Sequence, residues 1–190
     1  MNTSNKSSAL EQIRKAKLLF ASGQIKESIK EFTLAEQEGY ELLDIWLSRG
    51  AALLAISRYQ PAETDFSNVI EVQQDNERAY YYRGIARAAQ GRHLKAISDL
   101  TASLSRNSNR GIAHLIRGLS YAELGNRSDA ILDINSAGAF SDAELKSFSK
   151  LFGTIGHPFR NALAFMSEEN APWNNLLDRS SADRLMKLLQ

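Results

Sequence analysis

The chain has 190 residues, of which 43% are hydrophobic, and this is enough for one folded unit with a continuous core. Lys and Arg total 23 against 22 Asp and Glu, so the net charge of +1 provides no strong field to attract nucleic acid or an anionic membrane. Cysteine is absent, which excludes disulfides, thiolate metal sites and thiol nucleophiles.

The N-terminal segment is polar and contains no apolar stretch of signal-peptide length. We expect residues 1–8 to be disordered. The longest run of apolar and small residues, 50–56, is too short to span a bilayer. These features predict a soluble protein that is located in the cytoplasm.

From residue 9 onward the sequence repeats with a period of 34 residues, in units 9–42, 43–76, 77–110 and 111–144. Six columns recur in register, and they hold a base, a small residue, a turn residue, a second small residue, an acid and a bulky apolar residue. The columns are Lys15, Arg49, Arg83 and Arg117; Ala16, Gly50, Gly84 and Gly118; Gly23, Ser57, Gly91 and Gly125; Ser28, Ala62, Ala96 and Ala130; Glu31, Asp65, Asp99 and Asp133; and Phe32, Phe66, Leu100 and Ile134. A fixed period of this size indicates a repeat architecture, in which each unit buries its apolar face by stacking on its neighbours.

Each unit has the apolar spacing of two helices. In the second unit one helix carries Trp46, Leu47 and Leu53, and the other carries Phe66 and Ile70. The turn column lies between the two helices, where a left-handed residue would end the first. The two small columns allow the helix backbones to approach closely, and the bulky column fills the space beside them. The pattern therefore predicts antiparallel helical hairpins.

The charged columns are separated by 16 residues in every unit, which a hairpin brings together. We interpret them as structural ion pairs that set the register of the two helices, although pairing across adjacent units is also possible. The predicted pairs are Lys15 with Glu31, Arg49 with Asp65, Arg83 with Asp99, and Arg117 with Asp133.

Residues 145–190 are too apolar for a disordered tail, and we expect a capping helix followed by a helical tail. Residues 141–144, SDAE, form a capping box, and the apolar residues from Leu145 to Ile155 follow at helical spacing. Phe148 continues the column of Trp46, Tyr80 and His114. This segment resembles the first helix of an incomplete fifth unit that covers the fourth.

The offsets of the small residue, the turn glycine, the alanine and the bulky residue resemble those of the tetratricopeptide repeat, over residues 9–144. The first unit departs most, and the proline that usually ends such a repeat is missing from all four units. The resemblance implies an all-α, right-handed superhelix of helical hairpins. It also implies a non-catalytic protein–protein interaction module, an adaptor or scaffold.

In this family the first helices line a concave groove that holds the ligand. The resemblance implies a peptide-binding groove formed by Lys17, Leu47, Ala51, Leu54, Arg78, Tyr81, Tyr82, Ile85, Leu115, Ile116 and Leu119. These positions are mostly apolar and lack the carboxylate-clamping set with which some relatives grip acidic tails. We therefore expect a partner peptide or helix that is anchored by apolar side chains. The alternative is that these residues pack on neighbouring helices or under the C-terminal tail.

The sequence contains no constellation typical of an enzyme. Its three histidines are scattered without metal-ligand spacing, and it has no Gly-rich phosphate loop. We expect neither catalysis nor a cofactor nor a metal, and no nucleic-acid partner or membrane insertion. Two other functions remain open: a chaperone for aggregation-prone clients, resembling the repeat chaperones of secretion systems, and a scaffold that assembles with copies of itself.

Overall fold

The computed structural model describes residues 3–38 and 42–139, and the expectations for residues 145–190 lie outside these ranges. The described residues form helices and contain no strand. The helices are α1 (Thr3–Ala21), α2 (Ile25–Gln37), α3 (Leu42–Ala55), α4 (Tyr59–Val72), α5 (Glu77–Ala89), α6 (His93–Leu104), α7 (Gly111–Glu123) and α8 (Arg127–Ala139). The prediction of an all-α fold is confirmed.

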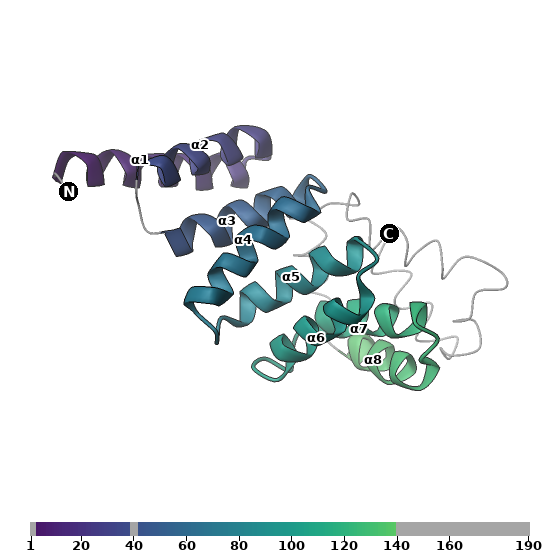
Figure 1. Cartoon of the computed structure of the whole chain (residues 1–190). Helices are drawn as coiled ribbons and strands as arrows, with labels where there is room; N and C mark the ends of the chain where they lie inside the picture. Colours follow the sequence, from purple (N-terminus) through teal and green to yellow (C-terminus); the bar gives the residue numbers. More distant parts are fainter. Residues whose placement is uncertain (1–2, 39–41, 140–190) are drawn as a thin grey trace.

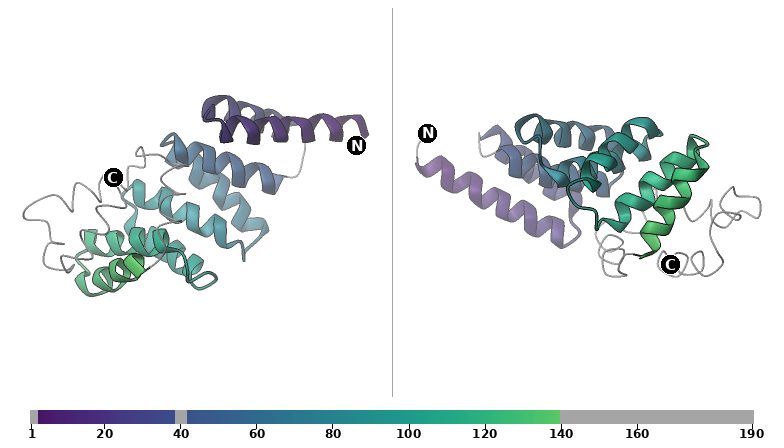
Figure 2. Two further views of the ribbon diagram at one scale, coloured as in Figure 1. Left: turned by 180° about the vertical axis from the view of Figure 1, so that it is seen from behind. Right: turned by 90° about the horizontal axis from the view of Figure 1, so that it is seen from below.

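The helices pair into hairpins 1 (α1, α2), 2 (α3, α4), 3 (α5, α6) and 4 (α7, α8), which stack into an elongated array (Figure 1). Each hairpin is rotated relative to the one before it, as the two further views show (Figure 2). The first helices α1, α3, α5 and α7 pack against one another more closely than the second helices do. The stack is therefore an α-solenoid that curves with its first helices on the inner side.

The turn column ends every first helix in the left-handed conformation, as the sequence predicts. The backbone φ is 81° at Gly23, 60° at Ser57, 70° at Gly91 and 75° at Gly125. The next residue then donates its amide to a carbonyl five positions back; for example, Arg92 N lies 2.9 Å from Arg87 O. This arrangement is a Schellman motif, for which glycine is the preferred residue.

The small residues of the first helices face the second helices at very short range. A Cβ atom added to Gly50 would lie 2.6 Å from the Phe66 ring, and one added to Gly84 would lie 2.7 Å from Leu100 Cγ. Both distances are shorter than any van der Waals contact. The close approach that the sequence predicts at these columns is confirmed, and the bulky column supplies the opposing side chains.

The N-terminus differs from its expectation. Residues 3–8, which we expect to be disordered, form the first turns of α1. No glycine or proline interrupts the chain between Thr3 and Ala21, so the backbone of α1 continues outward past the first repeat. The polar composition of this extension was misleading, because composition predicts exposure better than it predicts the backbone conformation.

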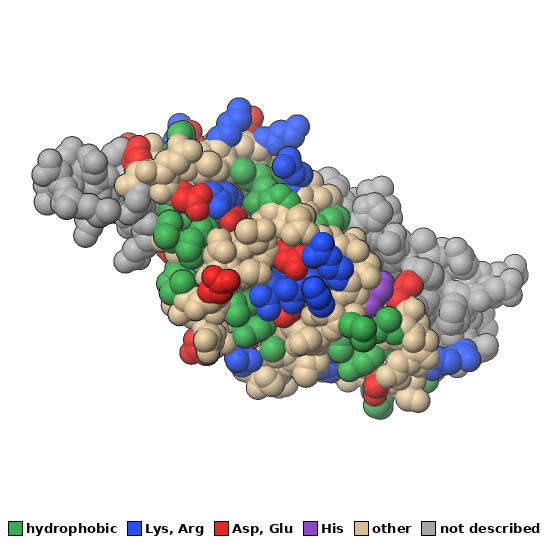
Figure 3. Space-filling view, viewed as in Figure 1, with side chains coloured by type: hydrophobic (Ala, Val, Ile, Leu, Met, Phe, Trp, Pro, Cys, Tyr) green, Lys and Arg blue, Asp and Glu red, His purple; other side chains and the backbone are tan. Residues whose placement is uncertain are grey.

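The largest core cluster runs through the middle of the array, from hairpin 2 to hairpin 4. Its buried members are Leu53, Leu54, Ala62, Phe66, Tyr81, Ile85, Ala86, Leu100, Leu104, Ile112, Ala113 and Ile116. A smaller cluster joins hairpin 1 to α3. On the face shown in Figure 3, Lys and Arg side chains lie beside Asp and Glu, so positive and negative charges are interspersed.

Candidate functional site

The candidate groove lies along the first helices α3, α5 and α7, with its N-terminal end at α1. Lys17 and Arg78 are exposed, while Ala51 and three larger apolar residues, Leu47, Tyr82 and Leu119, are half-buried. The three larger residues come from successive first helices, and each packs with one side against the main core cluster. The inner side of the solenoid thus presents a row of partly accessible apolar side chains between two cations.

The structure buries the other predicted lining residues. Leu54, Tyr81, Ile85, Leu115 and Ile116 are between 1% and 7% exposed. Four of them, all except Leu115, belong to the cluster that fills the space between adjacent first helices. The physical reason is that neighbouring hairpins stack closely, so these positions turn toward the next helix. They shape the floor of the groove, and a partner cannot touch them without displacing their cover.

The tyrosines of α5 are held in fixed positions by their neighbours. The Tyr82 ring stacks on Phe66 with the ring centroids 5.5 Å apart, and it lies 4.9 Å from the ring of Tyr81. The guanidinium of Arg110 lies 4.7 Å from the Tyr81 centroid. Aromatic and cation–π contacts of this kind restrict side-chain motion. The partly exposed Tyr82 is therefore a preorganised surface.

The charged columns meet within each hairpin. Lys15 Nζ lies 2.6 Å from Glu31 Oε1 in hairpin 1. In the other three hairpins the arginine donates two hydrogen bonds to its aspartate, at distances between 2.6 and 2.9 Å. The three aspartates are at most 7% exposed. Burial nevertheless raises the pKa of Asp65, against the effect of its hydrogen bonds from Arg49.

The same arginines also contact the preceding hairpin, which makes a ladder along the array. Arg83 Nη1 lies 3.2 Å from Ser67 Oγ, and Arg117 Nη1 lies 3.0 Å from Thr101 Oγ1. Arg49 instead donates to Glu36, which also accepts a hydrogen bond from Trp46 Nε1 at 2.8 Å. The hydrogen bond from Arg49 holds the pKa of Glu36 below its ordinary value. Pairing within a hairpin and pairing across hairpins therefore occur together.

A second charged network, which the period does not reveal, joins hairpins 2 and 3. The Glu63 carboxylate is 8% exposed and lies 2.9 Å from Arg87 Nε and 2.8 Å from Arg92 Nη1. Gln90 Nε2 adds a bond of 3.0 Å. Burial opposes ionisation of Glu63, but these hydrogen bonds and charges outweigh it, so its pKa lies below the ordinary value. Arg87 also reaches Asp99, at 2.8 Å.

This network was missed because each of its charges occurs once in its column. Glu63 occupies the column of Ile29, Ile97 and Ile131, and Arg87 replaces an apolar or aromatic residue in the other units. The available signal was that two opposite charges interrupt apolar columns in consecutive units. Charges at such positions require each other, because a buried charge without a partner is costly.

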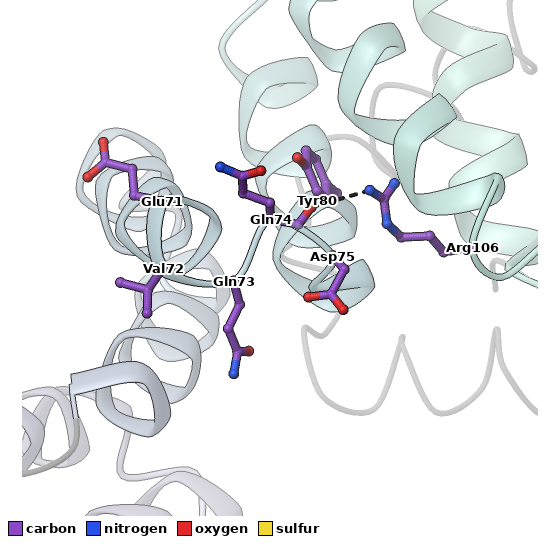
Figure 4. A pocket seen from close by; sticks show the side chains of 7 residues that line it. All are labelled: Glu71, Val72, Gln73, Gln74, Asp75, Tyr80 and Arg106. Atoms are coloured by element: carbon purple, nitrogen blue, oxygen red, sulfur yellow. Dashed lines mark hydrogen bonds between the residues drawn. The ribbon is translucent and has the colours of Figure 1, made fainter.

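An open pocket of about 660 Å³ lies outside the groove, at the connection between α4 and α5. It is lined by Glu71, Val72, Gln73, Gln74, Asp75, Tyr80 and Arg106. Figure 4 shows Arg106 against the ring of Tyr80, which faces the end of α4 across the opening. The Arg106 guanidinium lies 4.9 Å from the ring centroid, and Arg106 also donates to backbone carbonyls of Ala102 and Gln74. These contacts brace hairpin 2 against hairpin 3.

The described residues contain no cluster of His, Cys, Asp and Glu that could hold a metal ion. His114 Nδ1 lies 2.9 Å from Asp133 Oδ1, beside Arg117, so this histidine belongs to the structural ladder. Among the described helices, none is long and apolar enough to cross a membrane.

Comparison with known proteins supports the repeat assignment. Residues 47–104 match the family model of the tetratricopeptide repeat. No curated protein sequence matches the chain.

Three solved structures of repeat proteins are similar to this fold. YrrB, described as a TPR protein with an unusual peptide-binding site, has a TM-score of 0.64 at 21% identity, over 69% of this chain and 68% of YrrB. The OM64 TPR domain of Arabidopsis has a TM-score of 0.59 at 21% identity, over 62% of this chain and 98% of that domain. A thermophilic TPR protein of Thermus thermophilus has a TM-score of 0.58 at 20% identity, over 95% and 98% of the two chains. At these identities the similarity demonstrates the fold alone.

Proposed function

Because this chain is a tetratricopeptide repeat protein, we propose that it is a non-catalytic adaptor or scaffold that holds a partner peptide or helix in the groove formed by its first helices. The observation that carries the proposal is the row of Leu47, Tyr82 and Leu119 on successive first helices. Partly exposed apolar side chains aligned on the concave side of a solenoid are typical of an interaction surface.

The charges at the groove indicate the composition of the partner. Lys17 and Arg78 are the exposed cations of the proposed lining, and Lys17 Nζ lies 3.4 Å from Asp44 Oδ2. Only a weak positive potential remains at this end of the groove. We expect a segment whose apolar side chains contact Leu47, Tyr82 and Leu119, with acidic groups playing a secondary part.

The test compares two matched variants of the full chain. Leu47→Glu with Leu119→Glu places charges in the groove, whereas Leu94→Glu with Leu132→Glu places them on second helices, where the leucines are 74% and 66% exposed. Each immobilised variant is used to capture proteins from native extract, which are identified by mass spectrometry. We expect a partner that is captured by the wild type and the second variant but is lost from the first. Equal capture by both variants would contradict the groove assignment.

Circular dichroism provides the folding control. Both variants should keep the helical content of the wild type, because all four leucines are at least partly accessible. If the groove variant unfolds, substitution of Arg78 by Glu replaces it, because Arg78 is exposed and its side chain can change without disturbing the core.

A further inference from the structure

We propose that the outer face of hairpin 4 is a docking surface and that residues 145–156 of the same chain occupy it. This inference is independent of what the groove binds. It concerns the end of the solenoid, and it determines whether the array can be extended by a second copy.

The inner hairpins show how one hairpin covers the next. Ala35 on α2 is fully buried in a cluster with Ile45, which lies ten residues later on the following first helix. Val69 on α4 is 1% exposed in a cluster with Ala79, again ten residues later. The following first helix therefore covers this column of the second helices.

The last described hairpin is covered in the same way although no described helix follows it. Ala137, the member of this column on α8, is 1% exposed. Leu115 on α7 is also 1% exposed. An alanine on the end face of a solenoid would be accessible to solvent, as the capping face of a repeat protein generally is.

The chain supplies one candidate for the cover. Residues 1–2 precede α1 and residues 39–41 join α2 to α3, so both segments belong to the opposite end of the array (Figure 1). Residues 140–190 continue directly from α8. Adding ten to 137 gives Ser147, between Leu145 and Phe148, in the segment whose apolar spacing is helical.

The composition of this segment also explains why the array would end there. Phe152 lies 34 residues after Gly118, in the column where an added Cβ already meets the opposite helix at 2.9 Å or less. Leu151 stands in the column of Arg117, which is the ladder arginine. A segment with these two changes can cover hairpin 4 but cannot pair with a second helix of its own. Docked there, it closes this end against stacking by another copy.

The test exploits the absence of cysteine from the chain. Ala137→Cys with Ser147→Cys should form a disulfide on mild oxidation, as should the control pair Val69→Cys with Ala79→Cys from the described interface. The rival pair Ala137→Cys with Ala164→Cys tests whether the later apolar segment provides the cover. We expect a bond within one chain for the first pair, at a yield that does not depend on protein concentration, and none for the rival pair.

Three results would overturn the proposal. These are no bond between positions 137 and 147 while the control pair forms, a bond that appears only between chains, or preferential bonding to position 164. A second measurement avoids cysteine altogether. Phe148→Asp should lower Tm by about 5 °C or more and accelerate amide exchange in α7 and α8, whereas Phe165→Asp should not. The reverse order would contradict the choice of segment.

Discussion

Glu77, the first residue of α5, accepts two hydrogen bonds from Arg110, the residue before α7, at 3.0 and 2.9 Å. Ser103 Oγ on α6 donates a third, at 2.7 Å. This carboxylate therefore joins three elements at the interface between hairpins 3 and 4. Burial opposes its ionisation, but the hydrogen bonds from Arg110 and Ser103 and the nearby positive charges outweigh that effect and hold the pKa of Glu77 below its ordinary value of 4.5.

The lowered pKa predicts acid sensitivity that originates at Glu77. A carboxylate whose pKa is lower in the folded state contributes stability above its unfolded pKa, and this contribution is lost as the pH falls through the folded value. The free energy of unfolding should therefore decrease from about pH 5 downward, and Glu77→Gln should show less of this decrease. Urea denaturation at several pH values measures it. Asp65, whose pKa is raised, acts in the opposite direction, so equal slopes for Glu77→Gln and the wild type would contradict the assignment.

The ladder predicts unequal costs for removing its arginines. Arg49→Met leaves Asp65, which is 5% exposed, without its guanidinium partner and should destabilise the fold by about 3–5 kcal/mol. Arg83→Met should cost less, because Arg87 Nη1 still lies 2.8 Å from Asp99. Chemical denaturation of the two variants gives the comparison. Addition of Asp65→Leu to Arg49→Met should restore part of the loss, and a double-mutant cycle without coupling would contradict the pairing.

The left-handed turn at Ser57 predicts a stabilising substitution. A residue with a Cβ is strained at a φ of 60° by about 1–2 kcal/mol, and glycine relieves that strain at an entropic cost of about 0.5–1 kcal/mol. Ser57→Gly should therefore raise Tm by a few degrees. The reciprocal change Gly91→Ser, at a φ of 70° with open space around the position, should lower it. Differential scanning calorimetry of both variants distinguishes turn strain from any packing effect.

The apolar C-terminal tail predicts an effect of truncation. Residues 157–190 lie outside the described ranges, but Phe159, Leu163, Phe165 and Met166 are too apolar to be left in water. We expect them to fold back onto the groove lining of the third or fourth unit. Deletion of 157–190 should then either strengthen partner capture or cause self-association, which light scattering detects. A truncated protein that is monomeric, stable and unchanged in capture would contradict this expectation.

The sequence predicts those features of the fold that recur in every unit. The turn residues, the small columns and the opposing bulky side chains each appear four times, so periodicity alone separates them from chance. Glu63 and Arg87 appear once, and their partnership depends on how two hairpins are rotated relative to each other. That rotation results from the packing of whole helices and has no signature in a single column.

The groove shows the same distinction. The resemblance places Tyr81 and Tyr82 together on the lining, but the structure buries Tyr81 and leaves Tyr82 partly accessible. Adjacent residues on a helix point about 100° apart, so a small change in the stacking of hairpins determines which of the two faces solvent. Sequence specifies the helix that lines the groove, and the side chains that a partner can reach follow from the interhelical packing.

The buried position of Glu63 also has a mechanical consequence. Its bonds to Arg87, Gln90 and Arg92 run between hairpins 2 and 3, so a force along the array has to break several charged contacts at once at this interface. Between hairpins 1 and 2 the Lys17–Asp44 contact is exposed and longer, at 3.4 Å. Under tension we expect hairpin 1 to detach first, while hairpins 2 and 3 remain together. Stretching single molecules between optical traps would reveal this order, and early separation at Glu63 would disprove it.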